Sequence, residues 1–368
     1  AIKTSRCNRH LITASCQDSY RLIPLRHHLV HKHFTNVLIP THPMAASLTA
    51  AVPRLLSSTA ARRGSRQAAA LSVPRTSSPA SRSPPLGRRR ASSAVMATYS
   101  DPDQKARHAA AVAEDCTRVL DITKVYEPGY LKGARVLITG GNRGVGLDLV
   151  KECAKQGAQV VATCRKSSDE LDAVPGVQII TGIDVTSADA CAKLGTEVGE
   201  PLDVVVNNAG YFYEPVEKID TLNFDEELKM INICAVGPLR VTSALFNAGK
   251  LKKGSKVAMI TSQGGSIAWR TTQNPEGHDY GHHMSKAAAN MAGVLLAQEL
   301  KHSGVIVTCL HPGFNKTEMT AKYKDAWDEE GAVDPECGAM RVMHEIGLLT
   351  PDHAGKFINC EDGLEIPW

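Results

Sequence analysis

Two patterns of apolar and polar residues alternate along residues 133–368. Short runs of consecutive apolar residues are typical of strands that are buried on both faces of a sheet. They are separated by longer segments with apolar residues on one side, which is typical of helices packed on a core. The predicted strands are Ala134–Ile138, Gln159–Thr163, Val177–Ile180, Asp203–Val206, Lys256–Ile260, Val305–Cys309 and Phe357–Ile358.

The predicted helices are Leu147–Gln156, Ser187–Val198, Asn223–Phe246 and Tyr280–His302, with Thr186 as the N-cap of the second. Strand and helix therefore alternate with short connections. This alternation predicts an α/β fold, a single Rossmann-type doubly wound parallel sheet with helices on both faces. Ligands of such sheets bind at the carboxyl ends of the strands, so the segments that follow the strands are the candidates for function.

The first strand is followed by Thr139-Gly140-Gly141-Asn142-Arg143-Gly144-Val145-Gly146 and then by a helix. Glycines in such a turn allow a tight bend, close approach of backbone N–H groups to a pyrophosphate, and packing of the helix on the strand. The helix N-terminus then points its positive dipole end at the phosphates. The spacing differs from the commonest dinucleotide fingerprint, so a glycine-rich turn without a ligand is the alternative.

Basic residues follow the second strand, where dinucleotide sites distinguish NAD from NADP. An acidic residue there binds the ribose 2′-hydroxyl of NAD, whereas Arg accommodates the 2′-phosphate of NADP. This chain has Arg165 and Lys166 at that place, and Arg143 in the glycine turn, which favours NADP(H) over a solvated basic loop. After the third strand, Asp184-Val185 is a candidate contact for the adenine, and Asp184 is equally well explained as a turn or capping residue.

Charge divides the chain near residue 100. Residues 1–100 contain 15 Lys and Arg and one acidic residue, whereas residues 101–368 contain 27 Lys and Arg against 37 Asp and Glu. The acidic second part argues against nucleic acid as a partner. Residues 44–96 contain nine Arg, no Lys and no acidic residue, and are rich in Ser, Ala and Pro. That composition is typical of an organelle transit peptide.

We therefore expect residues 44–100 to be a disordered leader that directs the protein to the plastid stroma. The alternatives are the mitochondrion, or an uncleaved basic tail in the cytoplasm. Residues 1–43 contain no initial Met, and we interpret them as disordered, translated upstream sequence before a start at Met44. Residues 101–132 should form a helix and linker ahead of an NADP(H)-binding domain over residues 133–368.

Ten cysteines are scattered along the chain without Cys-x-x-Cys or the spacing of metal ligands. We therefore expect ordinary thiols in a reducing compartment and no metal site. No apolar run reaches the roughly 18 residues that a membrane span requires. A small molecule is thus the expected binding partner.

After the fourth strand comes Asn207-Asn208-Ala209-Gly210. Together with the glycine turn, this tetrapeptide resembles the short-chain dehydrogenase/reductase family, and the resemblance covers residues 133–368. The segments Gly237–Leu239 and Tyr280–Ala288 resemble the C-factor-like and carbonyl-reductase-like members of that family. The resemblance implies that Asn207, Ala209 and Gly210 border the cofactor.

The resemblance implies further site residues. The family places a catalytic Ser after the fifth strand, and Ser262 stands there in this chain. It places Pro-Gly after the sixth strand, followed by a Thr that binds the nicotinamide carboxamide; these are Pro312, Gly313 and Thr317. The polar stretch Glu318–Asp334 then reads as a lid over the substrate.

The catalytic helix departs from the family pattern Tyr-x-x-x-Lys. In the family, Lys lowers the pKa of the Tyr and binds the nicotinamide ribose, and the Tyr passes the proton. Lys286 is present, but the position four residues before it holds His282. Tyr280 lies two residues earlier still, rotated off that face of the helix. Because Lys286 disfavours a charged neighbour, His282 should be neutral and a weaker acid than a phenol.

The catalytic Asn of the family is replaced as well. Counting back three residues from Gly237 gives Cys234, and Asn232 lies two residues earlier. We therefore expect an NADPH-dependent oxidoreductase that reduces a small carbonyl or quinone-like compound, with His282 or Tyr280 as proton donor. The alternative is a degraded enzyme that acts as an NADP(H)-binding sensor or partner protein. An epimerase or dehydratase on the same fold also fits these residues.

Family members often form oligomers through their long helices. In the helix Tyr280–His302, small residues permit close packing: Ala287, Ala288, Ala289, Ala292 and Gly293. We expect a homo-oligomer, although such a face can equally pack inside the monomer. The identity of the substrate and the direction of the reaction are not encoded in a readable motif.

Overall fold

The computed structural model describes residues 98–368. The upstream sequence predicted over residues 1–43 lies outside the described residues, and so does almost all of the transit-peptide-like leader predicted over residues 44–100. The strands among the described residues are β1 (Arg135–Thr139), β2 (Gln159–Thr163), β3 (Gln178–Ile180), β4 (Leu202–Asn207), β5 (Leu251–Ile260), β6 (Ile306–His311) and β7 (Phe357–Asn359). The helices are α1 (Gln104–Ala113), α2 (Thr117–Leu120), α3 (Gly144–Lys155), α4 (Asp169–Asp172), α5 (Ala188–Glu197), α6 (Phe224–Ile231), α7 (Gly237–Asn247), α8 (Arg270–Gln273), α9 (Tyr280–Leu300) and α10 (Pro335–Leu348).

All the strands belong to one parallel sheet with the order β3-β2-β1-β4-β5-β6-β7. The order reverses between β1 and β4, and such a switch point is where doubly wound sheets bind their ligands. The register places Thr139 opposite Thr163, so β1 and β2 end side by side. The predicted Rossmann-type fold is confirmed.

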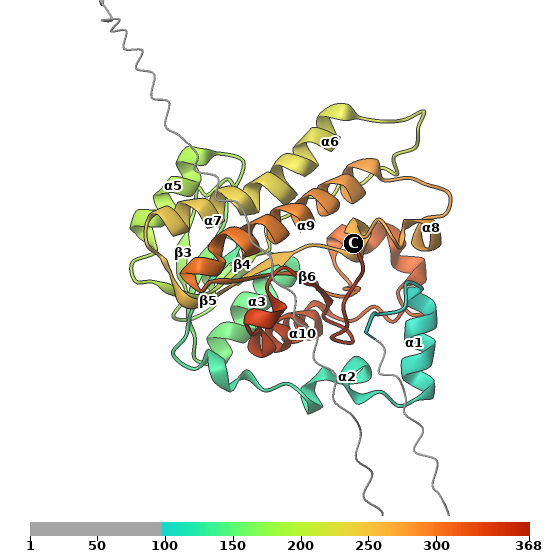
Figure 1. The fold of residues 1–368 in the computed structure, drawn as a ribbon, viewed down its shortest axis with the longest axis horizontal. Coiled ribbons are helices and arrows are strands. Elements are labelled where there is room, and N and C mark those ends of the chain that lie inside the picture. Colours follow the sequence, from blue (N-terminus) through green and yellow to red (C-terminus); the bar gives the residue numbers. More distant parts are fainter. Residues whose placement is uncertain (1–97) are drawn as a thin grey trace, which may run out of the picture. The chain divides into compact units, whose positions relative to one another are not determined.

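Helices cover both faces of the sheet (Figure 1). Neighbouring residues of a strand point to opposite faces. Val136 and Ile138 of β1 accordingly pack in the layer that contains α3 and α10, whereas Leu137 packs with α5, α7 and α9. Because every central strand is buried on both sides, its sequence is a continuous apolar run.

The predicted helix Asn223–Phe246 is interrupted. A π-helical turn, Asn232–Val236, separates α6 from α7. Pro238 lacks an amide hydrogen, so the ordinary helical bond to the carbonyl of Cys234 cannot form, and the turn widens there. The predicted N-cap at Thr186 is also wrong. Ser187 caps α5, since its hydroxyl accepts a hydrogen bond from the Ala190 amide at 3.2 Å.

The first and last described segments lie together. Tyr99 forms a bridge with Glu365, and the Ser100 amide donates a hydrogen bond to the Glu365 carbonyl at 3.0 Å. The predicted helix and linker over residues 101–132 contain α1 and α2, which lie at the same side of the molecule (Figure 1). Arg341 of α10 donates a hydrogen bond to the Val119 carbonyl of α2. Within residues 98–368, no helix combines the length and the apolar character that crossing a membrane requires.

Candidate active site

A cavity of about 1890 Å³ lies at the carboxyl ends of the strands. It is larger than the roughly 300–1000 Å³ of most small-molecule pockets and has room for a dinucleotide together with a second ligand. We call two parts of it the cofactor end, lined by residues after β1, β2, β3 and β4, and the substrate end, lined by residues after β5 and by the segment before α1.

The glycine turn is packed so tightly that side chains are excluded from it. A Cβ at Gly146 would overlap the Gly140 carbonyl oxygen and the Asn208 side-chain nitrogen, and Gly140 and Gly144 both have positive φ, at 67° and 54°. At Gly144, by contrast, only Thr317 comes within 4.0 Å of the position of a Cβ, so open space borders the turn. The turn therefore offers bare backbone to the cavity.

The N-terminus of α3 opens into that space. Helices α1, α4, α5 and α6 each have an N-cap side chain that accepts a hydrogen bond from the first turn. Helix α3 begins after Arg143, which makes no such bond, and Arg143, Gly144, Val145 and Gly146 line the cavity. Free N–H groups at a helix N-terminus bind phosphate, so the residues present fit the pyrophosphate of a dinucleotide.

Asn208, rather than Asn207, joins the strand ends at the cofactor end. The Thr139 hydroxyl accepts hydrogen bonds from the amides of Asn208 and Ala209, both at 3.0 Å, and the Asn208 side chain donates to the Thr139 carbonyl at 3.1 Å. Ala209 and Gly210 line the cavity. Asn207 is buried and donates to Thr242 at 3.1 Å instead, so the prediction that it borders the cofactor is wrong.

Three basic residues predicted to choose the cofactor border the cavity: Arg143, Arg165 and Lys166. Arg165 and Lys166 are exposed, and neither forms an ion pair within residues 98–368. Arg143 forms an ion pair with Glu318 at 3.1 Å, but both side chains are largely exposed, so the pair contributes little stability. Three basic side chains thus border the cofactor end.

Asp184 and Val185 also line the cofactor end. The Asp184 carboxylate accepts hydrogen bonds from the Thr186 hydroxyl at 2.7 Å and the Thr186 amide at 2.8 Å, and these bonds lower its pKa. Both bonds use Oδ1. The carboxylate therefore shapes the turn and still has Oδ2 to offer to a ligand.

At the substrate end, Ser262, His282 and Lys286 come together. Ser262 Oγ accepts a hydrogen bond from the Gly264 amide at 3.0 Å, which leaves its own hydrogen free to donate. A Cβ on Gly264 would lie 3.2 Å from Ser262 Oγ and 3.1 Å from His282 Nε2, so the missing side chain leaves the two atoms facing one space. Lys286 is buried and donates to the Ile260 carbonyl at 3.4 Å.

Tyr280 is not part of this group. Its side chain is 38% exposed at the start of α9, and it does not line the cavity. The suggestion that Tyr280 supplies the proton is therefore not supported by its position. Among the cavity-lining tyrosines, Tyr323 donates its hydroxyl hydrogen to Asp279 at 2.8 Å, and its pKa is raised by burial and by that carboxylate.

His282 is held neutral. Burial lowers its pKa well below the ordinary value, and the neighbouring charges of Lys286 and Lys322 lower it further. Its ring lies 4.3 Å from the ring of Phe212, and Lys322 Nζ lies 3.8 Å from that Phe212 ring. His282 Nδ1 is buried and has no partner among the described residues. Its proton is then best carried on Nε2, the nitrogen near Ser262.

The position of the family's catalytic Asn lies in the π-helical turn. Cys234 is buried there, and its sulfur accepts from the Tyr211 amide and donates to the Tyr211 carbonyl, both at 3.4 Å. The thiol thus fixes the backbone before Phe212 rather than entering the cavity. Asn232, the other candidate, makes no side-chain hydrogen bond within residues 98–368 and does not line the cavity.

The loop after β6 forms a further part of the cavity wall. Pro312, Gly313 and Thr317, which the sequence places near the cofactor, line the cavity, and Gly313 has a φ of 85° that favours glycine. Residues Glu318–Ala326 of the predicted lid form a 3₁₀ segment. Its Lys322 pairs with Asp279 at 3.2 Å, which ties the lid to the start of α9.

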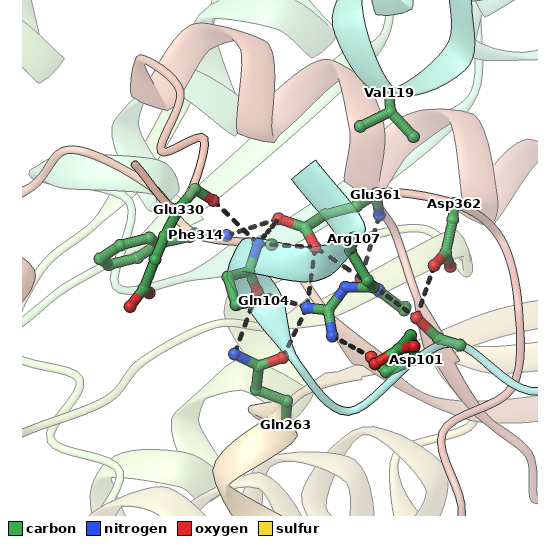
Figure 2. A network of polar contacts seen from close by, with 12 residues as sticks. Asp101, Gln104, Arg107, Val119, Gln263, Phe314, Glu330, Glu361 and Asp362 are labelled. Atoms are coloured by element: carbon green, nitrogen blue, oxygen red, sulfur yellow. Dashed lines mark hydrogen bonds and ion pairs between the residues drawn. The ribbon is translucent and has the colours of Figure 1, made fainter. Parts of the chain in front are cut away.

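A polar network that the sequence did not indicate brings α1 into the site (Figure 2). Arg107 pairs with buried Glu361 at 3.2 Å and donates to Gln263, the residue after Ser262, at 2.8 Å. Gln104 donates to Glu361 at 3.1 Å, and so does the amide of Phe314 at 3.1 Å. One carboxylate therefore connects α1, the Ser262 turn and the loop after β6.

Glu361 is ionised in this network. Burial alone would raise its pKa, but the charges of Arg107 and Arg341 and the amide of Phe314 outweigh it and lower the pKa to about 2. Pro102, Asp103, Gln104 and Lys105 line the substrate end as a result. Within residues 98–368, no three His, Cys, Asp or Glu side chains gather in a way that could hold a metal ion.

The chain is similar to known oxidoreductases. The model of the short chain dehydrogenase family matches residues 134–328. A 1-hydroxy-2-glutathionyl-2-methyl-3-butene dehydrogenase from Rhodococcus sp. is 33% identical over 236 residues, which cover 63% of this chain and 99% of the relative.

Solved structures agree. The carbonyl reductase Sniffer of D. melanogaster is 26% identical, with a TM-score of 0.55, and the match covers 64% of this chain and 100% of the other. A short chain dehydrogenase from Burkholderia cenocepacia, in complex with NADP, is 25% identical, with a TM-score of 0.53 and coverage of 63% and 98%. The chain therefore belongs to the short-chain dehydrogenase/reductase family, oxidoreductases that use a nicotinamide cofactor.

Proposed function

We propose that this protein is an NADPH-dependent reductase of a small carbonyl or quinone-like compound. The observation that carries the proposal is the approach of Ser262 Oγ and His282 Nε2 to one space beside Gly264, next to buried Lys286. A hydroxyl with a free hydrogen and an imidazole N–H are the groups that a carbonyl oxygen needs while it gains negative charge.

NADP(H) rather than NAD(H) is supported by the basic side chains that border the cofactor end. Arg165 and Lys166 follow β2, where a 2′-phosphate binds in this fold, and no acidic residue stands in that place. The uncapped N-terminus of α3 would hold the pyrophosphate, and Thr317 would face the nicotinamide. The reduced nicotinamide supplies the hydride when it is bound.

The chain's own residues then have separate roles. Ser262 Oγ donates a hydrogen bond to the substrate oxygen and orients it. Lys286, which is buried, stabilises the negative charge that develops there and holds the cofactor ribose. His282 Nε2 delivers the proton to that oxygen. Because His282 is neutral, it is a weak acid, and we expect turnover below that of family members with Tyr.

The experiment compares the natural protein with His282→Tyr and His282→Phe in the oxidation of NADPH by aldehydes, ketones and quinones. We expect His282→Tyr to raise kcat by roughly 10²–10⁴-fold, the contribution of one general acid. His282→Phe should be the slowest. If all three proteins reduce the same substrates equally fast, His282 is not the proton donor.

The pH profile gives a second test of His282. Its pKa is lowered, so the charged form, the stronger acid, becomes scarcer as the pH rises above neutrality. If the charged form donates the proton, kcat should fall about tenfold per pH unit between pH 6.5 and 8.5. His282→Tyr should remove this slope. A flat profile in the natural protein assigns the donation to neutral imidazole or to water.

A second candidate function is binding of NADP(H) without turnover. It is favoured by the low pKa of His282 and by the position of Cys234, which fixes Tyr211 instead of entering the cavity. Calorimetry of NADPH binding distinguishes the two. Tight binding by the natural protein, with turnover only in His282→Tyr, supports the second candidate and contradicts the first.

We also propose a homo-oligomer. Of the five small residues of α9 that were expected to permit close packing, Ala289 and Gly293 are buried against the protein's own core and are not available to another subunit. Large apolar side chains are exposed on α9 and on α6, which packs against it: Met291, Leu295, Phe224 and Leu228 are 60–66% exposed, and we call these four residues the apolar surface of α6 and α9. Exposed apolar residues gathered on neighbouring helices are typical of an interface.

A further inference from the structure

Among residues 98–368, Arg270 has no negatively charged partner. It begins α8 at the substrate end, is partly buried and lines the cavity. Its Nε donates to the Ser266 carbonyl at 3.0 Å, and its Nη2 donates to the Gln263 carbonyl at 3.0 Å and to the Gln273 side chain. Within residues 98–368, no carboxylate lies within 4 Å of the guanidinium group. Such burial without a counter-charge is costly.

The remaining nitrogen, Nη1, lies 3.4 Å from His283 Nδ1. That contact is not a hydrogen bond once the protons are assigned. The Asn274 side-chain NH₂ donates to the His278 carbonyl at 3.1 Å and lies 3.0 Å from His283 Nε2, so Nε2 is an acceptor. The proton of His283 is therefore on Nδ1, which donates to the Gly264 carbonyl at 3.0 Å.

Two N–H groups of Arg270 Nη1 are consequently left without an acceptor in the described residues. Burial lowers the pKa of Arg270 to about 10, and burial together with the charge of Arg270 lowers the pKa of His283 to about 4, so the guanidinium stays charged beside a neutral imidazole. The hydrogen bonds of Nε and Nη2 to the turn after Ser262 give these two nitrogens a structural role. They give no role to Nη1.

Carboxylates that line the same cavity do not fill this role. Asp103 caps α1, since its side chain accepts from the Ala106 amide at 3.1 Å. Glu330 is partly buried, and burial raises its pKa. Neither pairs with Arg270. The described residues therefore supply no negative partner for Arg270 Nη1.

We propose that Arg270 Nη1 binds a carboxylate of the substrate, so that the natural substrate class is a small aldehyde or ketone bearing a carboxylate. This inference rests on the proposed reductase function. Arg270 and Ser262 are connected through the Gln263–Ser266 turn, so the guanidinium holds the acid group while Ser262 holds the carbonyl. Guanidinium groups match carboxylates in geometry and charge.

The test uses the full chain with two aldehydes that differ only in charge, 4-carboxybenzaldehyde and its neutral methyl ester, with NADPH. The readout is the ratio of their kcat/KM values. In the natural protein the acid should be preferred by roughly 10- to 100-fold, the worth of one charged hydrogen-bonded contact. Arg270→Gln should reduce the ratio to about 1, and Arg270→Lys should retain part of it.

Lys324→Gln is the matched control, because Lys324 is an exposed lid cation that does not line the cavity. Its ratio should equal that of the natural protein. If Arg270 has only a structural role, Arg270→Gln slows both aldehydes alike and leaves the ratio intact, which overturns the proposal. Inhibition by inorganic phosphate as strong as that by benzoate would show a general anion site instead, and would overturn the assignment to a carboxylate.

Failure of the reductase function is distinguishable from failure of this inference. If neither aldehyde is reduced, calorimetry with benzoate and the protein–NADPH complex still measures the site. Binding that is lost in Arg270→Gln and kept in Lys324→Gln supports the inference without turnover. Reduction of both aldehydes at equal rates by the natural protein supports the reductase and overturns the carboxylate site.

Discussion

The two ends of the cavity are built in different ways. At the cofactor end, bare backbone from consecutive residues of the glycine turn lines the wall, and Asn208 and Thr139 join neighbouring strands behind it. At the substrate end, side chains from distant segments meet, and Arg107 connects Glu361 with the Ser262 turn by its hydrogen bond to Gln263. The residues that match the family model, 134–328, include the whole glycine turn of the cofactor end. They exclude Arg107 and Glu361 of the substrate end.

The difference shows which properties each end can change. Backbone groups held by tight packing bind the part of the ligand that is common to the family, so few substitutions are tolerated there. Side chains on loops and on α1 set the shape and charge of the substrate end, where substitutions alter specificity without dismantling the sheet. Variants that act on one end and spare the other should therefore be obtainable.

The largest effect on cofactor binding is expected from Gly146→Ala. The added methyl group would overlap backbone and the Asn208 side chain, so the turn must open and move its N–H groups. We expect NADPH affinity to fall roughly 100-fold, because such overpacking costs ~1–3 kcal/mol or more. Fluorescence titration with NADPH measures it. Gly129→Ala is the control, since a Cβ there meets nothing within 4 Å; equal losses in the two variants would refute the packing argument.

Glu361→Gln should damage the substrate end and spare the cofactor end. It leaves buried Arg107 and Arg341 without their carboxylate, which should lower the free energy of unfolding by about 3–5 kcal/mol. NADPH affinity should change far less than in Gly146→Ala. Urea denaturation and NADPH titration of the same variant measure both quantities.

The effect of Glu361→Gln should depend on pH in a defined direction. The folded pKa of Glu361 is about 2, below its ordinary 4.5. Its ionised form therefore stabilises the fold fully above about pH 4.5, and this contribution is lost as the pH falls toward 2. The stability difference between natural protein and variant should shrink over that interval. A difference that is constant from pH 7 to pH 3 would contradict the ionised assignment.

Arg165→Asp should exchange the cofactor without changing the substrate. The acidic side chain can accept from the ribose 2′-hydroxyl and repels a 2′-phosphate. We expect the preference for NADPH over NADH to fall roughly 10- to 100-fold, the range for one charged contact. The ratio of kcat/KM for the two cofactors measures it. Lys301→Asp, an exposed charge change at the far end of α9, should leave that ratio unaltered.

The smallest effect on activity is expected from Leu295→Glu. Leu295 is 60% exposed on α9 and lies outside the cavity, so neither end should change. The charge should separate the subunits if the apolar surface of α6 and α9 is an interface. Light scattering would then report a monomer at micromolar concentration. Gln298→Glu, a neighbouring exposed change, is the control.

Much of this architecture follows from the sequence, and the exceptions have physical reasons. Six of the seven strands lie within two residues of their predicted bounds because their apolar runs mark them, whereas β5 begins five residues earlier than predicted, in a polar segment. The glycine turn is predictable because its spacing reports backbone geometry. Asn207 was misassigned because side chains alternate along a strand, so a shift of one residue exchanges the buried and the cavity-facing Asn.

The substrate end was harder to predict because its contacts leave no local pattern. Arg107 and Glu361 are ordinary charged residues in the sequence and become a buried pair only when the chain has folded. Trp269 is likewise buried only in the folded chain, where it lies beneath Arg107. The break in the helix at Asn232–Val236 required knowing how Pro238 changes the preceding turn.

The network around Glu361 also has a consequence for the order in which the protein assembles. Thr139 and Asn208 are 69 positions apart, whereas Arg107 and Glu361 are 254 apart. Contacts between distant positions form late, and a chain emerging from the ribosome presents its N-terminal parts first. The nucleotide-binding face can therefore close while synthesis continues. The substrate end can form only after Glu361, close to the last residue of the chain, has been synthesised.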